Sequence, residues 1–242
     1  MEKAQHHFHP WWSYTEDHKH EEGLMIISHT HPRYLRRREA AGKNRYNGAF
    51  YYSREIVKNI IPNVETDRNW ITINIPGEGV SHAIFFVHNN LQPEKYDWLH
   101  QYGFQDVILV CGTEETYKHY DEEGRHKAIY LPLSIDTEYV KQFEVKEKTK
   151  KVAFAGRKSK TIFGHLPEGI DYLSGMKRKE LLQEMAKYEQ IYAVGRTAIE
   201  AKALGCKVLP YDVRFPDPRI WKVIDNKDAA KLLQKKLDVI DR

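Results

Sequence analysis

Short apolar runs alternate with longer amphipathic stretches along the chain from residue 23 onward. This alternation is typical of βα units, in which a buried strand is followed by a helix that packs on the sheet. Most of the runs are apolar at nearly every position, and such strands favour a parallel sheet that is covered on both faces. The predicted strands are residues 24–28, 70–75, 83–87, 106–111, 127–133, 151–155, 170–173, 191–194 and 207–211.

Helices are predicted between these strands from a 3.6-residue periodicity and from residues that start or stop a helix. Pro62 ends one of them, Pro93 opens another at a position where proline is tolerated, and Gly205 ends a third. The last predicted helix is apolar on one face, which indicates packing on a core. The predicted helices are residues 50–61, 93–100, 113–120, 177–188, 197–204 and 228–240.

A stretch rich in lysine and glutamate at residues 141–151 indicates a linker between two runs of βα units. We therefore predict a histidine-rich N-terminal extension at residues 1–22, a first Rossmann-like domain at residues 23–140 and a second at residues 150–242. The C-terminal helix is expected to cross back onto the first domain. The predicted fold class is thus α/β with two Rossmann-like units.

The composition is that of an ordinary globular protein. Of the 242 residues, 41% are hydrophobic and 30% are charged, whereas disordered chains are less hydrophobic. The longest apolar runs span five or six residues, and a transmembrane helix needs about 20, so we predict no membrane span. Residues 1–22 lack the apolar core of a signal peptide and the two cysteines cannot form a disulfide framework, so a cytoplasmic location is expected.

One segment is strongly basic although the net charge of the chain is only +4. Six cations fall within thirteen residues, and Tyr34 and Tyr46 accompany them. Such a cluster can bind a polyanion such as DNA through its phosphates, but a solvated, mobile loop has the same composition. Both interpretations stay open for Arg33, Arg36, Arg37, Arg38, Lys43 and Arg45.

Histidines follow two of the predicted strands, where open α/β sheets bind ligands. His29 and His31 come after the first strand, and His88 comes after the third. An imidazole there can act as a general base near neutral pH, orient an acceptor, or be purely structural. Because no cysteine or well-spaced carboxylate joins these histidines, we predict no metal site.

A glycine turn at Gly195 precedes a predicted helix with the pattern x-E-A-x-A-x-G-x-x-V, which begins at Ile199. This segment resembles the donor-binding motif of the GT-B glycosyltransferases of group 1. A helix N-terminus offers free N–H groups and a partial positive charge to phosphates. The resemblance implies that Gly195, Arg196 and Thr197 line the diphosphate of a nucleotide sugar and that Glu200 accepts the ribose hydroxyls.

Two further segments resemble other parts of this family. Gly156, Arg157 and Lys160 follow a predicted strand and are similar to the first donor loop, whose cations neutralise the diphosphate. Asn47 and Gly48 precede a predicted helix and are similar to the glycine-rich acceptor loop. With these segments, the resemblance covers most of residues 24–212 in the order that the family has.

The chain also departs from the family pattern. Residues 129–140 resemble the stretch that closes the acceptor domain, but Ser134 replaces its usual glycine. Tyr192 stands eight residues before Glu200, where the retaining branch has a second glutamate. Lysines also follow Arg157 more closely than usual. These departures favour an alternative function, a GT-B-like protein that binds a nucleotide, a sugar or nucleic acid without catalysis.

The resemblance implies a glycosyltransferase whose two Rossmann-like units face each other across a cleft. The implied donor is a nucleotide sugar, whereas the sequence does not identify the acceptor, for which a glycan and a nucleic acid both stay open. His29 or His31 is the implied catalytic base of an inverting enzyme. No metal or other cofactor is required, because arginine, lysine and a helix N-terminus stabilise the leaving diphosphate. The implied acceptor-side residues are Asn47, Gly48, His88 and Asn89.

Overall fold

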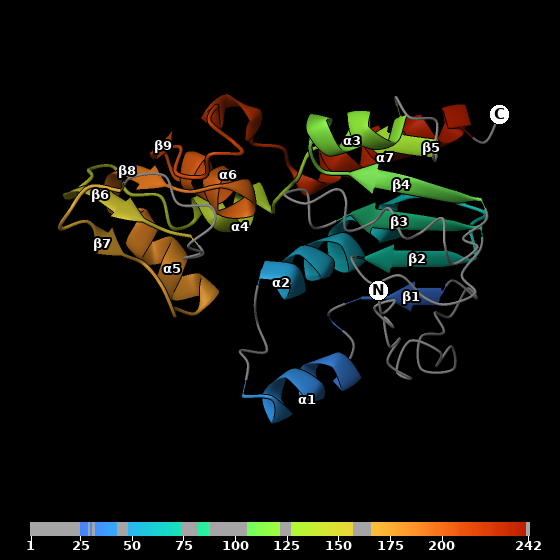
Figure 1. Ribbon diagram of the computed structural model, residues 1–242, viewed down its shortest axis with the longest axis horizontal. Helices are drawn as coiled ribbons and strands as arrows, with labels where there is room; N and C mark the ends of the chain where they lie inside the picture. Colours follow the sequence, from blue (N-terminus) through green and yellow to red (C-terminus); the bar gives the residue numbers. More distant parts are fainter. Residues whose placement is uncertain are drawn as a thin grey trace, which may run out of the picture. The chain divides into compact units, whose positions relative to one another are not determined.

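The computed structural model describes residues 25–28, 30, 32–42, 48–73, 82–87, 106–121, 127–156 and 166–240. The chain divides into two compact units, and each is built on a parallel β-sheet (Figure 1). Unit 1 comprises Met1–Leu131 and Leu233–Arg242, and unit 2 comprises Pro132–Leu232. The predicted α/β class is therefore confirmed.

Unit 1 contains a five-stranded sheet whose strands lie in the same order in space as in the sequence. Every neighbouring pair is parallel, for example at Ile84 and Ile108 in the centre. All residues of the third and fourth strands are buried, as expected for a sheet that is covered on both faces. The strands are β1 (Met25–Ile27), β2 (Trp70–Ile73), β3 (Ala83–Val87), β4 (Val107–Cys111) and β5 (Lys127–Tyr130).

Much of the basic segment after β1 folds as a helix, α1 (Pro32–Ala40). A proline at the first helical position costs no hydrogen bond, because the first N–H groups of a helix have no intrahelical acceptor. The Leu35 side chain is buried while Arg36 is exposed, so the helix has an anchored face and a solvated face. The interpretation of this segment as a loop is therefore wrong for residues 32–40.

The predicted helix at residues 50–61 begins earlier and changes its winding toward the end. It starts at Gly48 as α2 (Gly48–Glu55), widens into a π-helical turn, η3 (Ile56–Ile60), and tightens into a 3-10 turn, η4 (Ile61–Asn63). Pro62 explains the end, because it cannot donate to the preceding turn. After β4 the chain forms α3 (Glu114–Asp121), close to the predicted bounds.

Unit 2 contains a four-stranded parallel sheet whose order in space differs from its order in the sequence. Its second strand pairs with one side of its first strand, and the chain then crosses to the other side, where the third and fourth strands follow. This reversal creates a topological switch point between the first and third strands. In spatial order the strands are β7 (Asp171–Tyr172), β6 (Lys150–Phe154), β8 (Tyr188–Tyr192) and β9 (Lys207–Leu209).

Helices accompany the strands of unit 2 and continue to residue 240. The last of them runs from unit 2 into unit 1, where the backbone N–H of Glu65 donates to the Gln234 side chain at 2.6 Å. Among the described residues, no helix combines the length and the apolar character that crossing a membrane requires. The helices are α4 (Thr137–Lys141), α5 (Arg178–Met185), α6 (Gly195–Ala203), the 3-10 turn η6 (Pro218–Ile220) and α7 (Asn226–Ile240).

The charged stretch that the sequence assigns to a linker belongs to the body of unit 2. Lys148 Nζ donates to the carbonyl of Ala186 at 2.8 Å and to that of Leu204, which cap the C-terminal ends of α5 and α6. These carbonyls carry the negative end of each helix dipole, so a lysine between them stabilises both helix ends. The division of the chain lies before Pro132 and not after residue 140.

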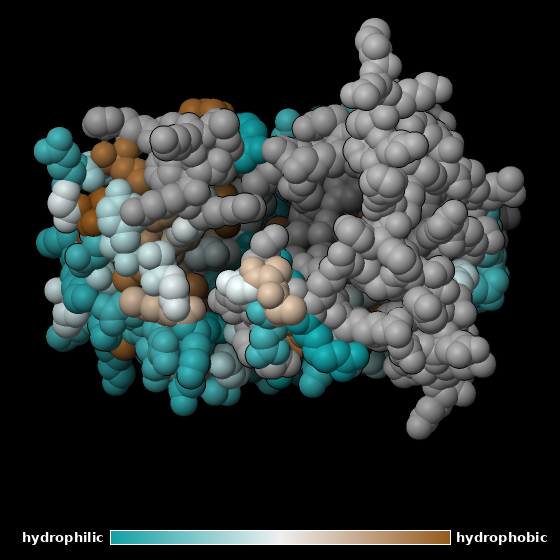
Figure 2. Space-filling model, turned by 60° about the horizontal axis from the view of Figure 1, so that its bottom comes forward, coloured by the Kyte–Doolittle hydropathy of each residue, from teal (hydrophilic) through white to brown (hydrophobic). Residues whose placement is uncertain are grey.

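The described surface is of mixed polarity. Figure 2 shows hydrophilic side chains over much of the described part of one face, with smaller apolar patches between them. Two large exposed apolar side chains are Tyr172, at the carboxyl end of β7, and Met176, between β7 and α5. Both lie at the carboxyl edge of the unit 2 sheet.

Candidate functional site

The carboxyl ends of β6 and β8 meet at the switch point of unit 2. Phe154 and Tyr192, the last residues of these strands, are partners in the ladder, and the Ala155 N–H donates to the Tyr192 carbonyl at 3.0 Å. The segment that begins at Gly156 and the segment that leads into α6 therefore start side by side. These are two of the segments that the resemblance assigns to the nucleotide donor.

The N-terminus of α6 is suited to an anion. Gly195 has φ +60°, in the left-handed region that glycine adopts readily, and apart from its chain neighbours and its own helix backbone nothing lies within 4 Å of the position that a Cβ would take. Val194 precedes the helix and supplies no side-chain cap. The first N–H groups of the helix lack intrahelical acceptors and carry a partial positive charge. A phosphate can therefore accept hydrogen bonds from Gly195, Arg196 and Thr197.

Gly156 is explained by packing. A Cβ at this position would lie 2.7 Å from the Tyr211 hydroxyl oxygen and 3.0 Å from the Phe154 ring. Tyr211 is 4% exposed and its ring packs edge-on against Phe154 at 4.8 Å between centroids. The close approach of an aromatic side chain thus requires the glycine, whereas the resemblance attributes it to a phosphate loop. Arg157 and Lys160, the cations of that loop, lie outside the described residues.

Two arginines hold the Glu200 carboxylate. Arg178 approaches Oε1 with Nε at 3.2 Å and Nη2 at 3.0 Å, and Arg196 approaches the same oxygen with Nε at 2.9 Å. The Glu200 side chain is only 5% exposed, and those of Arg178 and Arg196 are 12% and 14% exposed. A buried carboxylate is costly unless it is paired, so this ion-pair cluster accounts for the burial of Glu200.

The cluster restricts the role that the resemblance gives to Glu200. An ionised carboxylate has about four lone-pair sites, so it can accept from two guanidinium groups and from a ribose. A ribose would nevertheless have to share this carboxylate with Arg178 and Arg196. The ribose contact of Glu200 stays a prediction.

Sequence reasoning missed Arg178, although a signal for it exists. Arg178 is the first residue of α5 and Arg196 is the second residue of α6. A cation in the first turn of a helix opposes the helix dipole, so two such arginines are unusual. The predicted helices began at residues 177 and 197. Arg196 therefore lay outside its predicted helix, and the sequence did not place it in a first turn, where the helix dipole repels a cation.

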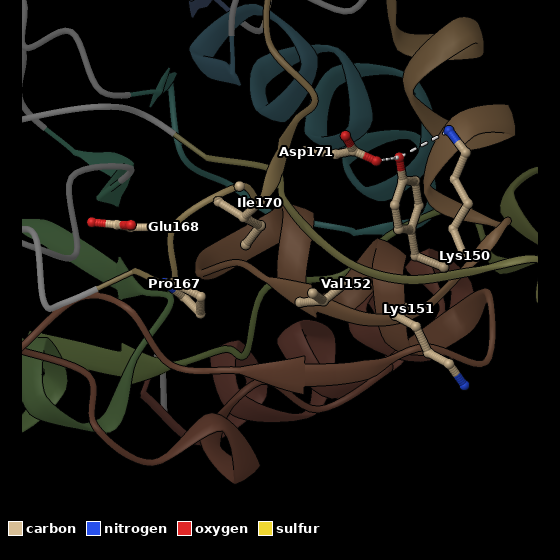
Figure 3. Close-up of a pocket in the computed structure, with 9 residues that line it drawn as sticks. Lys150, Lys151, Val152, Pro167, Glu168, Ile170 and Asp171 are labelled. Carbon is tan, nitrogen blue, oxygen red and sulfur yellow. Dashed lines mark hydrogen bonds between the residues drawn. The ribbon is translucent and has the colours of Figure 1, made fainter.

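A cavity of about 360 Å³ lies at the other edge of the unit 2 sheet, near the amino ends of β6 and β8 (Figure 3). Tyr188 donates to Asp171 at 2.8 Å and accepts from Lys150 at 3.0 Å, while Lys150 also donates to Glu184 at 2.6 Å. The hydrogen bond to Glu184 raises the pKa of Lys150, and burial raises the pKa of Tyr188. At neutral pH both groups are therefore protonated, and neither is an activated base or nucleophile.

The amino edge of the unit 1 sheet carries a polar cluster around Asp106. Its carboxylate contacts His82 Nδ1 at 2.6 Å and Arg68 Nη1 at 2.9 Å, and these hydrogen bonds lower its pKa from 3.8 to about 2. Both His82 and Asp106 have φ of +51°. The Asp106 carbonyl also accepts from the Ala83 N–H at 3.2 Å. The cluster thus ties together the segments that lead into β2, β3 and β4, and we interpret it as structural.

The remaining predicted residues belong to unit 1. Gly48 is the first residue of α2, and β1, which precedes two of the predicted histidines, is an edge strand of its sheet. In the part of the chain that the structure describes, no three His, Cys, Asp or Glu side chains are grouped so that they can hold a metal ion. The predicted residues outside the described ranges are His29, His31, Asn47, His88 and Asn89, together with Lys43 and Arg45 of the basic segment.

The chain was compared with protein-family models and with curated proteins. No family model matches the chain, and no curated protein matches it either. The resemblance to GT-B glycosyltransferases therefore depends on the quoted motifs and on their positions in the fold.

Proposed function

We propose that the protein is a glycosyltransferase and that unit 2 binds its nucleotide-sugar donor at the switch point between β6 and β8. One observation carries the proposal. The segments that resemble donor loops, at Gly156 and at Gly195–Thr197, begin side by side where the strand order reverses. Open α/β sheets bind nucleotides at this place because loops on either side of the reversal diverge and leave a crevice.

The chemistry of the α6 N-terminus suits a diphosphate. Its N–H groups can donate hydrogen bonds to the leaving diphosphate and so stabilise the negative charge that develops on it when the bond to the sugar breaks. Arg196 lies in the same turn and adds a guanidinium, which recognises phosphate oxygens in a bidentate manner. Tyr172, 43% exposed at the end of the neighbouring strand β7, offers an aromatic face on which a base can stack.

The acceptor belongs to the same proposal and would be activated by residues of unit 1. In an inverting enzyme, His29 or His31 removes the proton of the acceptor hydroxyl. The acceptor is either a glycan or a polyanion such as DNA that binds the basic helix α1. Salt separates these two, because the binding of duplex DNA weakens with a slope of about −0.9 per phosphate contact in a plot of log K against log salt concentration. The binding of a neutral glycan should change little with salt concentration.

Calorimetric titration with UDP, GDP, ADP and their sugars tests the donor site. We expect one nucleotide to bind, and we expect it to slow hydrogen exchange in the peptides that contain residues 154–156 and 193–200. Protection at the amino edge of the sheet, near Lys150 and Asp171, would contradict the proposed position. If none of the nucleotides binds, the proposal fails as a whole.

A second candidate function is a nucleotide-binding protein without transferase activity. It is favoured by Tyr192, which ends β8 at the position where the retaining branch of the family has a second glutamate. Release of nucleoside diphosphate from the bound sugar nucleotide distinguishes the two. Turnover with water or with an added acceptor supports the transferase, and tight binding without turnover supports the second candidate.

A further inference from the structure

We propose that the helix α1 of unit 1 is an interface for nucleic acid and that Arg33, Arg36 and Arg37 contact its phosphates. This inference deepens the acceptor part of the proposed function by naming the partner of α1. It makes no use of the donor site of unit 2, so either of the two can fail while the other stands.

The net charge of the chain is concentrated around α1. Residues 23–54 contain seven lysines and arginines and one glutamate, a net charge of +6 (7 − 1). The whole chain has a net charge of +4, so all the other residues together carry −2 (4 − 6). A local excess of positive charge attracts polyanions, and contacts to phosphates dominate the affinity of proteins for nucleic acid.

The fold of α1 places three arginines on one side of the helix. Leu35 is buried, which fixes the side that faces the protein, and Arg36 is exposed. Because consecutive helical residues are turned by about 100°, positions 33, 36 and 37 lie about 100–200° around the helix from position 35. They therefore lie on the side away from the buried leucine, at the periphery of unit 1 (Figure 1). Arg38, which is half-buried and has other contacts, does not belong to this side.

The charges of α1 are unfavourable for the helix itself. Arg33 lies in the first turn, which contains no acidic residue, and Arg37 follows it four residues later. Both arrangements destabilise a helix, because a cation opposes the positive end of the dipole and like charges at this spacing repel each other. The helix α3 has the favourable order, with Glu114 and Glu115 in its first turn and Lys118 in its last. A bound polyanion offsets the repulsion in α1, which gives the arrangement a physical reason.

Nucleic acid is the polyanion that suits this helix. Duplex DNA carries one phosphate per about 1.7 Å of its axis, so several arginines on one side of a helix can each contact a phosphate. Arginine also binds phosphate oxygens through two parallel N–H groups. An anionic membrane suits it less, because a helix that binds there inserts an apolar side, and Leu35, the only large aliphatic residue of α1, is buried in the protein.

Titration of a labelled DNA duplex, and of DNA and RNA single strands, tests the inference at salt concentrations between about 50 and 200 mM. No nucleotide is added, so the donor site does not affect the result. We expect the wild type to bind, with log K falling against log salt concentration by about 0.9 per phosphate contact for the duplex and about 0.7 for single strands. The tightest of the three shows which form of nucleic acid the helix binds.

Replacing Arg33, Arg36 and Arg37 by glutamate should weaken binding about tenfold or more and reduce the slope by about 3, one for each arginine. Lysine at the same positions keeps the charges and should preserve the slope. Arg36→Gln changes one exposed residue and should by itself reduce the slope by about 1. It tests the inference even if the triple glutamate variant does not fold.

The matched control lies on α7, where Lys231, Lys235 and Lys236 are replaced by glutamate. Both triple glutamate variants have the same net charge of −2 (4 − 6). A difference between them therefore depends on the position of the charges and not on their total. We expect the control to bind nucleic acid more tightly than the α1 variant and to keep the slope of the wild type.

Three results would overturn the inference. The first is equal weakening by the two triple glutamate variants, which would show that only the total charge matters. The second is a wild type that binds none of the three nucleic acids. The third is equally tight binding of phosphatidylserine vesicles with the same dependence on Arg36, which would assign the helix to a membrane. The nucleotide titration of unit 2 is a separate measurement, and none of these results changes its outcome.

Discussion

The two sheets of this protein are built from similar strands but differ in strand order. In unit 1 the five described strands follow one another across the sheet without reversal, whereas in unit 2 the chain reverses between β7 and β8. Both sheets are parallel and both bury apolar strands at their centres. Only the second order has a reversal of the kind at which open α/β sheets bind ligands. Similar strand composition is therefore compatible with different strand orders, and only unit 2 has a switch point among its described strands.

The charged clusters of the two units also lie at different edges of their sheets. In unit 2, a glycine with positive φ and two arginines lie at the carboxyl edge, close to the switch point. In unit 1, the polar cluster around Asp106 lies at the amino edge, where it ties strand ends together. The comparison thus separates the region in which we propose a ligand site from a region whose polar residues tie strand ends together, and each contrast can be tested.

The largest expected effect concerns the independence of the two cores. Phe85 in β3 is 2% exposed and packs in one cluster with Cys111, whereas Phe154 in β6 is 1% exposed. Replacing either by alanine should cost about 3–5 kcal/mol of the free energy of unfolding, because it leaves a cavity. Burial raises the pKa of Cys111 to about 12, so this thiol reacts only after local opening.

Thiol labelling in native buffer reports the opening of each unit. Phe85→Ala should accelerate the labelling of Cys111 by roughly two orders of magnitude or more and leave Cys206 unchanged. Phe154→Ala should have the reverse effect. Equal acceleration of both thiols by one variant would show that the units open together, as a single cooperative structure.

The next effect concerns Gly156 and its packing against Tyr211. Gly156→Ala places a methyl group 2.7 Å from the Tyr211 hydroxyl oxygen, so the aromatic side chain has to move. We expect a loss of about 1–3 kcal/mol in urea unfolding, the usual cost of overpacking. Adding Tyr211→Phe removes the closest of these contacts and should recover part of the loss. A neutral Gly156→Ala variant would contradict the packing explanation.

A smaller effect is expected at the start of α6. Gly195→Ala meets no neighbouring atom but forces an L-residue to φ +60°, at a cost of about 1–2 kcal/mol. Gly205→Ala, at the other end of the same helix with φ +74°, carries a similar backbone cost. Urea unfolding and nucleotide titration are measured for both. If the α6 N-terminus binds phosphate, only Gly195→Ala weakens the nucleotide, and equal weakening by both would argue against this position.

The smallest effect is the contribution of Asp106 to stability. Hydrogen bonds from His82 and Arg68 lower its pKa in the folded protein to about 2, below the usual 3.8. The contribution is therefore complete above about pH 4 and is lost as the pH falls toward 2. Because Asp106 is 42% exposed, solvent screening limits it to about 1 kcal/mol or less. Wild type and Asp106→Asn should differ in urea unfolding at pH 6 and converge near pH 2.

Some elements could be predicted from the sequence with nearly correct bounds. All five residues of β3 are apolar, and the predicted strand has the same bounds as the observed one. β8 is different, because Glu189 and Gln190 are polar and the predicted strand therefore began only at residue 191, whereas the observed strand begins at Tyr188. Its true start is fixed by pairing, since Tyr188 lies beside Lys150 of β6. A strand that is half polar depends on its neighbour for its bounds.

The candidate site also combines features that depend on adjacent residues with features that depend on residues distant in the sequence. The glycine turn and helix at Gly195 could be found from a local motif, because a left-handed turn and a helix start depend on adjacent residues. The ion pairs of Glu200 could not, because Arg178 is 22 residues away and reaches it only after α5 and α6 pack together. The reason why position 156 requires a glycine could not be predicted from the sequence either, since Tyr211, which makes the close contact, lies after β9 in the chain.

The sequence by itself determined the α/β class, the nine strands found among the described residues and most of the helices there, because buried strands and amphipathic helices follow from the spacing of apolar residues. Only the tertiary structure decided the strand order, since each connection can place the next strand on either side of the last. It also decided which distant charges share one buried place, because the cost of burying a carboxylate is met only when its partners arrive together.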